Sequence, residues 1–507
     1  MTTLLAALAT HAAPPPSREA RVAAIIARHA DSPPALRVLL QKMPKGGDLH
    51  NHLDGSVYAE DYLSWADEDG FCVARATRAL TPPPCAADQV PARGLIGRDP
   101  KFYQETIDAL SMRNWYPGSG TGEASGHDHT FATFARFIPV GARHLGGMLA
   151  ATRRIAARDH VTYIEQMTDP AGAFSPALFG DDVAFDAGDF ETSLRALAPK
   201  LPALVAAARA EYDAAEAAMR EELHCNAFVL PAECAVTVHY LFYVVRTLPP
   251  KLVFAQIALG YALAAADPRF VGVDFVAPED DPVSLRDFPL HMRMFGFFHA
   301  RDPRIKLSLH AGELALGLVP PSELGFHIAD TVRVAGASRI GHGYSIPHET
   351  DAAKLLAEMA AKRVAVEINL TSNAITPGIV GPAHPLALYR AAGVPVTLSA
   401  DDEGVFRIDL TNEYVRAVTE QKLGYRDLKE LARNGLEYSF VAGASLWQRD
   451  YRKPVAACAG VALGAAQPPP ACAAFLAGSE KAALQWRFEA QVAAYEDAVL
   501  AGAFARP

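Results

Sequence analysis

The stretch "MPKGGDLHNHLDGSV", residues 43–57, contains a short apolar run that ends in two histidines one residue apart. Within it, "GDLHNHL" (47–53) predicts a β-strand. Residues i and i+2 of a strand point to the same side, so His50 and His52 can face one centre. On this spacing alone, the pair is either a metal site or two polar residues of a loop. The choice depends on what the rest of the chain places beside them.

Seven further segments have the composition of buried strands, because each is a short run rich in Val, Ile and Leu. They are "VTYIEQM" (161–167), "AVTVHYLFYVV" (235–245), "VGVDFV" (271–276), "IKLSLHA" (305–311), "RIGHG" (339–343), "VAVEINL" (364–370) and "VPVTLSA" (394–400). Helix-compatible segments, such as 204–223 and 349–363, lie between them. Eight strands that alternate with helices predict an α/β fold, a (β/α)8 TIM barrel. A doubly wound open sheet is the alternative, but no GxGxxG or Walker-type loop follows the first strand.

The predicted barrel covers residues 41–450. Residues 1–40 are interpreted as a tail followed by a helix, which gives the barrel an N-terminal helical extension. Residues 68–126 are rich in turn-forming residues and predict an insertion after the first strand. Residues 451–507 predict a C-terminal excursion and a helix.

Length and charge exclude several classes of protein. The chain has 507 residues, of which 50% are hydrophobic, so it can bury a large core. Its net charge of −10 argues against nucleic acid or an anionic membrane surface as partner, because phosphate groups are bound by clustered Lys and Arg. No apolar stretch reaches the roughly 20 residues that span a bilayer.

The spacing of the cysteines and the N-terminal residues indicate the cellular compartment of the protein. The six cysteines fall into three local pairs: Cys72 with Cys85, Cys225 with Cys234, and Cys458 with Cys472. None forms a CxxC, and local pairing favours disulfides, which form in an oxidising compartment. Residues 3–16 resemble the end of a secretory signal that lacks its basic region. These features predict a periplasmic or secreted protein; free thiols in a cytoplasmic protein are the alternative.

Polar residues gather where the predicted strands end. The fifth strand ends in "SLHAGE", the sixth in "GHG" and the eighth in "SADD". Each of these signals has an ordinary structural explanation, such as a hydrogen-bonded histidine or a helix N-cap. Together they indicate one site, because the carboxyl ends of barrel strands converge on one face. The residues concerned are His310, Glu313, His342, Asp401 and Asp402.

Three imidazoles and a carboxylate suit a zinc ion with a water at the open position. Zinc lowers the pKa of such a water to about 7. Glu313 is then a candidate general acid or base, and His342 a candidate acceptor for the proton of the water. Asp54 and Asp402 are left to bind substrate. The region after the fourth strand, "VGVDFVAPEDD", has no lysine that could bridge two ions, which favours one metal ion.

The motifs "PKGGDLHNHLDGS", "SLHAGE", "RIGHG" and "LSADD", in this order, resemble the adenosine deaminase family of the amidohydrolase superfamily over residues 40–450. The resemblance implies hydrolytic deamination of adenosine, and of 2′-deoxyadenosine, to the inosine nucleoside and ammonia on one zinc ion. The implied zinc ligands are His50, His52, His310 and Asp401. Glu313 is implied to protonate the purine ring nitrogen, and His342 to orient or deprotonate the water.

The resemblance also implies substrate contacts. Asp54 is expected to hydrogen-bond the ribose, and Asp402 to contact the purine or hold the attacking water. The family usually has a glycine after the fourth strand, where this sequence has Ala277, so the purine preference stays open. The segment "HDHTFATFARF" (127–137) resembles the aromatic lining of the family's pocket. The helical period favours core packing over a substrate contact for Phe131 and Phe134.

Within the family, the length, N-terminal extension and cysteine-bearing insertion are similar to the secreted growth-factor-like branch, which implies a homodimer. Two alternatives stay open. One is deamination of another aminopurine, such as adenine, a modified adenine or an adenine nucleotide, although no basic cluster lies near Asp54. The other is a secreted growth-factor-like binding protein with incidental activity. A cytidine-type deaminase is excluded, because its P-C-x-x-C signature is missing.

Overall fold

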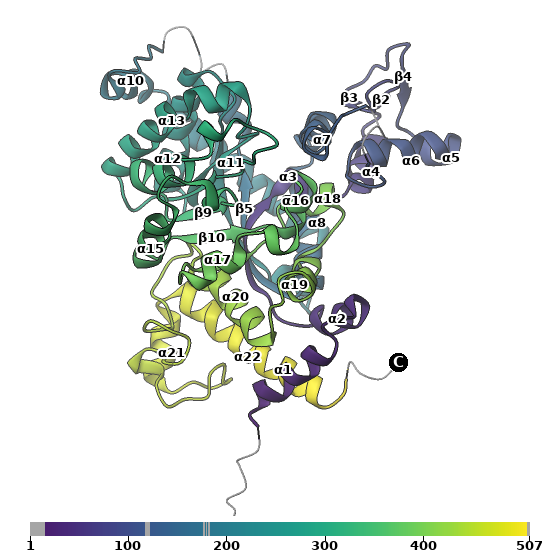
Figure 1. The fold of residues 1–507 in the computed structure, drawn as a ribbon. Coiled ribbons are helices and arrows are strands. Elements are labelled where there is room, and N and C mark those ends of the chain that lie inside the picture. The colour runs from purple at the N-terminus through teal and green to yellow at the C-terminus, as the bar shows by residue number, and fades with distance from the viewer. Residues whose placement is uncertain (1–15, 117–121, 176–177, 179, 181–182, 504–507) are drawn as a thin grey trace, which may run out of the picture.

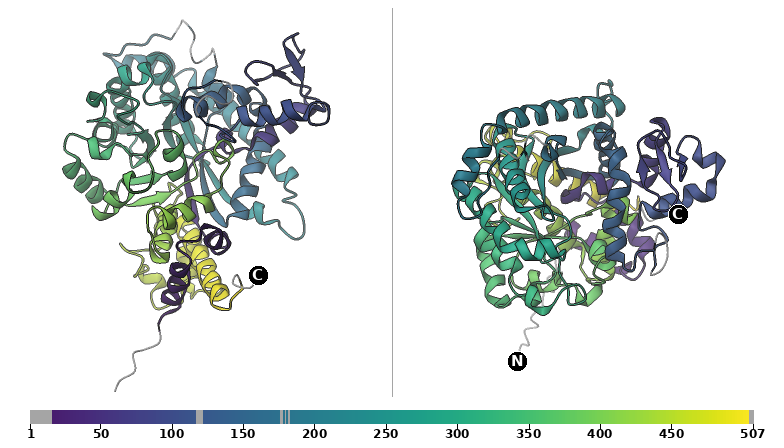
Figure 2. Two further views of the ribbon diagram at one scale, coloured as in Figure 1. Left: turned by 45° about the vertical axis from the view of Figure 1, so that its right-hand side comes forward. Right: turned by 90° about the horizontal axis from the view of Figure 1, so that it is seen from above.

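A computed structural model describes residues 16–116, 122–175, 178, 180 and 183–503. All eight predicted strands are present and form one parallel sheet in the order in which they occur in the chain. They are β1 (Gly46–His52), β5 (Val161–Thr168), β6 (Thr237–Val245), β7 (Phe270–Val276), β8 (Lys306–Ala311), β9 (Arg339–His342), β10 (Ala365–Ile368) and β11 (Val396–Leu398). The predicted TIM barrel is therefore confirmed. Helices surround the strands, as Figure 1 and the view from above in Figure 2 show.

The barrel closes between its first and last strands. An isolated parallel bridge joins Asn51 to Asp401. At this seam the His52 N–H donates to the Asp401 carbonyl oxygen over 3.1 Å, and the Asp401 N–H donates to the His50 carbonyl oxygen over 2.9 Å. The backbone of predicted metal ligands thus completes the barrel.

Helix α11 (Leu201–Glu222) buries one face. Its buried residues Leu204, Ala208, Tyr212, Ala215 and Met219 recur every three or four positions, which is the spacing of one helical face. From α8 onward, the helices that connect or follow the barrel strands are, in chain order, α8 (Leu145–Arg158), α10 (Phe190–Leu197), α11 (Leu201–Glu222), α12 (Pro250–Ala266), α13 (Pro282–Arg301), α14 (His327–Asp330), α15 (Ala352–Lys362), α16 (Leu370–Ile375), α17 (Leu386–Ala391), α18 (Glu403–Phe406), α19 (Leu410–Thr419) and α20 (Tyr425–Glu437). Strand β7 is almost wholly buried, as its continuous apolar run predicts.

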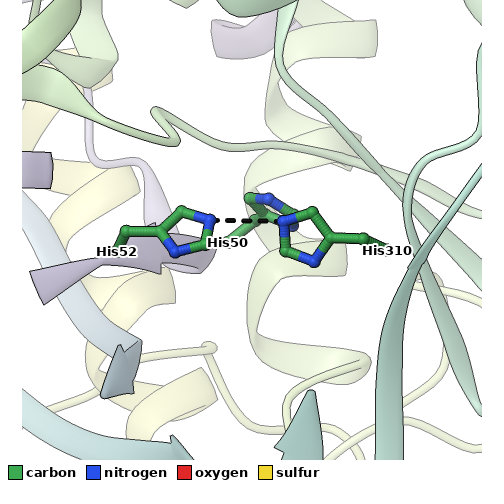
Figure 3. Close-up of side chains that lie close together, drawn as sticks. All are labelled: His50, His52 and His310. Atoms are coloured by element: carbon green, nitrogen blue, oxygen red, sulfur yellow. Dashed lines mark hydrogen bonds between the residues drawn. The ribbon is translucent and has the colours of Figure 1, made fainter. Parts of the chain in front are cut away.

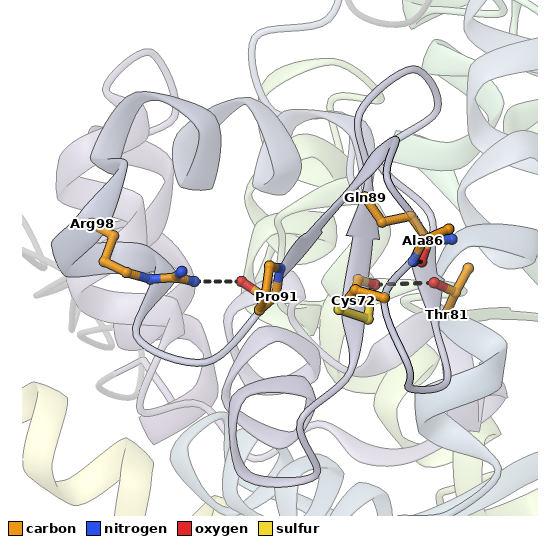
Figure 4. The surroundings of a disulfide bond; sticks show 7 residues. Cys72, Thr81, Ala86, Gln89, Pro91 and Arg98 are labelled. Atoms are coloured by element: carbon orange, nitrogen blue, oxygen red, sulfur yellow. Dashed lines mark hydrogen bonds between the residues drawn. A yellow bond between two sulfur atoms is a disulfide. The ribbon is translucent and has the colours of Figure 1, made fainter.

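The connection between β1 and β5 carries the segment predicted as an insertion. Its elements are α3 (Leu53–Ser56), α4 (Ala59–Glu68), β2 (Cys72–Ala74), β3 (Leu80–Thr81), β4 (Gln89–Pro91), α5 (Leu95–Arg98), α6 (Pro100–Ala109) and α7 (Gly126–Gly141). Strands β2 to β4 form a small antiparallel sheet that was not predicted. The Cys72–Cys85 disulfide ties β2 to the loop before β4 (Figure 4). In Figure 1 this sheet stands apart from the barrel.

The chain termini pack together beside the barrel. They contain α1 (Arg18–Arg28), α2 (Pro33–Leu40), α21 (Pro470–Ala477) and α22 (Glu480–Leu500). Helix α1 packs against α22 and α20 (Figure 2). Helix α2 was not predicted; it starts at Pro33, and proline suits the first turn of a helix, which needs no N–H donor. Most of the signal-like segment 3–16 lies outside the described residues. The division at residues 40 and 450 stays a prediction.

All three predicted cysteine pairs are joined as disulfides, the other two being Cys225–Cys234 and Cys458–Cys472. Among the described residues, no helix has both the length and the apolar character that a membrane crossing needs.

Candidate metal and catalytic site

The four predicted metal ligands meet at the carboxyl ends of the barrel strands. His50 and His52 end β1, His310 lies on β8 and Asp401 follows β11. The Nε2 atoms of His52 and His310 are 3.2 Å apart, with His50 close behind them (Figure 3). The Asp401 Oδ1 lies 3.5 Å from His50 Nε2 and 3.4 Å from His52 Nε2. The structure therefore brings all four side chains around one point.

The unsatisfied atoms at this point fit a metal ion. His50 Nε2 is buried and has no hydrogen-bond partner among the described residues. A buried polar atom without a partner is costly, unless something else binds it. One ring nitrogen from each of His50, His52 and His310 lies within 4.8 Å of the other two, and Asp401 Oδ1 lies within 3.5 Å of the first two. Three imidazoles and one carboxylate form a donor set that suits zinc. The residues present thus fit a single divalent cation.

Two buried acids orient the histidines. The Nδ1 of His50 lies 2.8 Å from Glu367 Oε2, and the Nδ1 of His310 lies 3.0 Å from Asp274 Oδ1. A carboxylate at Nδ1 holds the proton there and leaves the Nε2 lone pair facing the centre. Both acids were missed by the sequence reasoning. Each stands alone inside an apolar strand, in "VGVDFV" and "VAVEINL", and a charge in such a run is a signal for a partnered, buried group.

Glu313 is held at the edge of the metal centre in a form suited to an acid. Its backbone N–H donates to Glu279 Oε2 over 2.7 Å, and the Gly312 N–H donates to Glu279 Oε1 over 3.2 Å. Burial, together with the nearby carboxylates of Asp401 and Glu279, raises the pKa of Glu313 to about 8. The carboxyl group is therefore largely protonated at neutral pH and can donate a proton.

A chain of hydrogen bonds fixes the protonation of His342. The Leu386 N–H donates to His384 Nδ1 over 3.1 Å, and burial lowers the pKa of His384 to about 4. A neutral His384 therefore carries its proton on Nε2, which lies 3.0 Å from Asn373 Oδ1. The Asn373 amide nitrogen then donates to His342 Nδ1 over 2.9 Å.

This chain gives His342 a defined role. Its Nδ1 accepts a hydrogen bond, and burial lowers its pKa well below the usual value, so the ring is neutral with its proton on Nε2. That Nε2 lies 3.7 Å from Glu313 Oε1 and 3.8 Å from Asp401 Oδ2. Of the two predicted roles, orienting or deprotonating a water, this geometry favours orientation by an Nε2–H donor. Asn373 and His384 were not predicted as site residues.

The predicted substrate residues Asp54 and Asp402 also line the cavity above this centre. Burial raises the pKa of Asp54 to about 6. Burial and the neighbouring Asp401 raise the pKa of Asp402 well above its usual value. The Asp402 carboxylate lies against Gly55, where any Cβ would collide with it, so this position of the first motif must be glycine.

Three residues of the site have left-handed backbone conformations. Ala277, His342 and Asp401 all adopt positive φ angles, of 82°, 64° and 63°. Each follows or ends a barrel strand. The conformation is least favourable for Ala277, since Asp and His adopt it more readily than other residues with a side chain. Strain of this kind is found at functional sites.

The catalytic cavity has a volume of about 470 Å³. Phe131 and Phe134 of α7 line it, and Phe134 also packs against the core, as its helical spacing predicts. Helix α7 thus contributes both to the core and to the cavity wall. None of the described residues that line the cavity is a lysine or arginine. All nine predicted site residues lie in or directly below this cavity, but their individual roles stay predictions.

Comparison with known proteins adds an independent observation. Residues 226–445 match the sequence model of a family described as adenosine deaminase. Curated adenosine deaminases of Yersinia pseudotuberculosis (strain PB1/+) and Shewanella loihica (strain PV-4) are each 33% identical to this chain. These matches extend over 156 and 184 residues, which is 31% and 36% of this chain. The chain thus spans only 43% and 50% of the length of these relatives.

The solved structures that superpose on this chain include two deaminases. An adenine deaminase from Arthrobacter aurescens superposes with a TM-score of 0.49 and 18% identity, over 79% of this chain and 94% of the other. An N6-mAMP deaminase from Arabidopsis superposes with a TM-score of 0.49 and 19% identity, over 80% and 95%. The matched sequence segment contains His310, Glu313, His342 and Asp401, whereas His50 and His52 join the centre from outside it.

Proposed function

We propose that this chain, whose residues 226–445 match the adenosine deaminase family model, hydrolyses adenosine and 2′-deoxyadenosine to the inosine nucleosides and ammonia, with one zinc ion. The observation that carries the proposal is that three histidines, Asp401 and the buried carboxyl group of Glu313 meet at one cavity. His50, His52, His310 and Asp401 would hold the ion. When bound, zinc supplies a nucleophilic water at neutral pH.

The residues around the centre have separate tasks. Attack at C6 of the purine places negative charge on the ring, and the Glu313 carboxyl group donates a proton to the adjacent ring nitrogen. The Nε2–H of His342 donates to the attacking oxygen and orients it. Asp402 contacts the same oxygen or the purine, and Asp54 accepts from a ribose hydroxyl.

The charge of the cavity supports an uncharged nucleoside over a nucleotide. Its described lining contains four carboxyl groups besides the ligand Asp401, and no lysine or arginine: Asp54, Asp281, Glu313 and Asp402. A substrate phosphate would enter this cavity without a cationic partner, at a large cost in desolvation. The position of Ala277, with its methyl group at the base end, keeps a different aminopurine as the second candidate.

The three disulfides support an oxidising compartment, either the periplasm or the cell exterior. The sequence resemblance supports two further proposals. One is a role as a growth-factor-like binding protein, and the other is a homodimeric state.

A spectrophotometric screen tests the proposed function. Purified protein is supplied with adenosine, 2′-deoxyadenosine, adenine, N6-methyladenosine and AMP, before and after chelation and with zinc restored. Turnover of the first two that is lost on chelation and restored by zinc supports the proposal. Preference for adenine or AMP would overturn the substrate assignment, and turnover unaffected by complete metal removal would overturn the metal dependence.

A further inference from the structure

A second cavity of about 440 Å³ adjoins the catalytic cavity. Four residues line both cavities: Asp54, Ile138, Tyr243 and Val245. The two cavities are therefore adjacent, and these four residues form a common wall. The second cavity lies between the end of α7, the start of α8 and the loop after β5.

The shared residues set the order of groups along a bound nucleoside. Glu313 and Ala277 line only the catalytic cavity, so the purine base belongs at that end. Asp54, the proposed ribose contact, lines both cavities. A nucleoside with its base at Glu313 and its sugar at Asp54 directs whatever lies beyond the sugar toward the second cavity. On a nucleoside, that position is the 5′ carbon.

The second cavity is mainly apolar. Leu145, Met148 and Met167 form part of its wall. At its rim, Ile138 and Phe174 are 44% and 48% exposed, although both are large apolar side chains. An apolar substituent of roughly 5 to 10 heavy atoms could bind here. Each Å² of apolar surface that it buries would contribute about 25 cal/mol to the binding free energy.

Its polar groups disfavour an anion. Asp169 and Glu211 line it together with Asp54, and none of its described lining residues is a lysine or arginine. Burial raises the pKa of Asp169 to about 8, and its Oδ2 is buried without a hydrogen-bond partner among the described residues. A protonated Asp169 offers one hydrogen bond to a neutral group, whereas a phosphate would meet only acids.

We propose that the preferred substrates include adenine nucleosides whose 5′ position carries an uncharged apolar group, such as an alkylthio group, which the second cavity holds. The proposal rests on the proposed function. The reaction is unchanged: the oxygen of one water replaces the 6-amino group, which leaves as ammonia, and the 5′ substituent is untouched. The second cavity therefore contributes only to substrate binding.

The test compares kcat/KM for adenosine, 5′-deoxy-5′-methylthioadenosine, 5′-deoxy-5′-butylthioadenosine and AMP on the intact zinc-loaded protein. We expect the two thioethers to reach or exceed the value for adenosine, by up to about tenfold, since each buried methylene contributes. AMP should be at least about a hundredfold poorer, because its charge is buried beside acids.

The variant Ala142→Phe fills the second cavity from its exposed rim, and Ala142→Ser is the matched control of nearly unchanged volume. Ala142→Phe should lower kcat/KM for the thioethers by about tenfold or more and leave adenosine within about threefold. The control should match the unsubstituted protein on every substrate. Unchanged thermal unfolding of both variants shows that the fold is retained, and Ala171→Phe, on the opposite wall, replaces Ala142→Phe if that variant does not fold.

The outcomes separate the two proposals. If no purine nucleoside is deaminated, the proposed function itself fails, and this inference with it. If adenosine is deaminated but both thioethers are more than about a hundredfold poorer, the second cavity does not receive the 5′ substituent. The inference is equally overturned if Ala142→Phe reduces adenosine and the thioethers by the same factor.

Discussion

Two cavities at different places on the barrel have linings of opposite charge. The catalytic cavity, at the carboxyl ends of the strands, measures about 470 Å³ and is lined by acids, histidines and aromatic rings. A larger cavity of about 910 Å³ lies beside α20 and the start of β11. Its lining includes seven cationic residues: Arg363, Arg390, Arg426, Lys429, Arg433, Arg449 and Arg452.

The two cavities differ in how their charges are satisfied. In the larger one, Arg363 pairs with Glu437, Arg390 with Asp427, Arg426 and Lys429 with Glu19, and Arg433 with Glu489. At the catalytic site, Asp402 Oδ1 and the Nε2 of His50 below the cavity are buried without hydrogen-bond partners among the described residues. Buried groups without partners that converge with histidines and acids therefore indicate the chemical site, whereas the larger volume does not.

Removal of a metal ligand should give the largest difference in activity between a variant at the catalytic site and a variant in the larger cavity. In His310→Ala the centre loses one of four donors, so we expect the zinc content to fall to near background and the deaminase activity with it. Metal analysis by mass spectrometry and a deamination assay measure both. The matched control is Arg449→Ala in the larger cavity, which should retain both. Full zinc content with normal turnover in His310→Ala would disprove the ligand assignment.

Glu313→Gln tests the acid without disturbing the ligands. The amide keeps the size of the side chain but cannot donate the acid proton, so kcat should fall by about 10²- to 10⁴-fold. Zinc content should stay at the level of the unsubstituted protein. Steady-state kinetics and metal analysis on the same preparation measure this, and an unchanged kcat would exclude the acid role.

Asn373→Ala removes the donor to His342 Nδ1 and allows the proton of His342 to move from Nε2. We expect kcat to fall by about 10- to 100-fold with KM little changed, as is usual for residues that orient a catalytic group. His384→Gln, which keeps an amide donor toward Asn373, should lose less activity than His384→Leu. Equal losses in these two variants, or a loss confined to KM, would contradict the positioning role.

Ala277→Gly should have a small effect with two readouts. Glycine removes the left-handed strain of an alanine at φ 82°, and we expect it to raise the free energy of unfolding by up to about 1 kcal/mol. Removal of the methyl group should also change the ratio of kcat/KM between adenosine and adenine. Chemical denaturation and the substrate screen measure the two effects; destabilisation would contradict the strain argument.

The smallest effect is expected in the larger cavity. Arg390 and Asp427 form a partly exposed ion pair, so Arg390→Ala should cost about 0–1 kcal/mol of stability. Its deaminase kinetics should equal those of the unsubstituted protein. A strong loss of activity would show that the larger cavity is coupled to the catalytic one, and would contradict the conclusion that only the smaller cavity serves catalysis.

Much of this organisation could be predicted from local sequence. Strands such as "VGVDFV" have the continuous apolar runs of a sheet covered on both faces, and histidines at the ends of other strands, such as His310 and His342, indicate the site. The role of Asn373 could not be predicted, because it depends on a contact with His384 and His342 that only the folded chain creates. The short strands β2 to β4 were missed, since segments of two or three residues carry no measurable period.

The seam of the barrel links metal binding to the integrity of the whole sheet. The Asp401 N–H and carbonyl that close the barrel belong to a predicted zinc ligand, and its partners are the backbones of two others. A metal that binds the side chains of these residues stabilises only the closed arrangement. Amide hydrogen exchange at His52 and Asp401 should therefore slow when zinc binds, while exchange in α22, which supplies no predicted ligand, should change less. A bound ion would thus link the first strand of the barrel to the last.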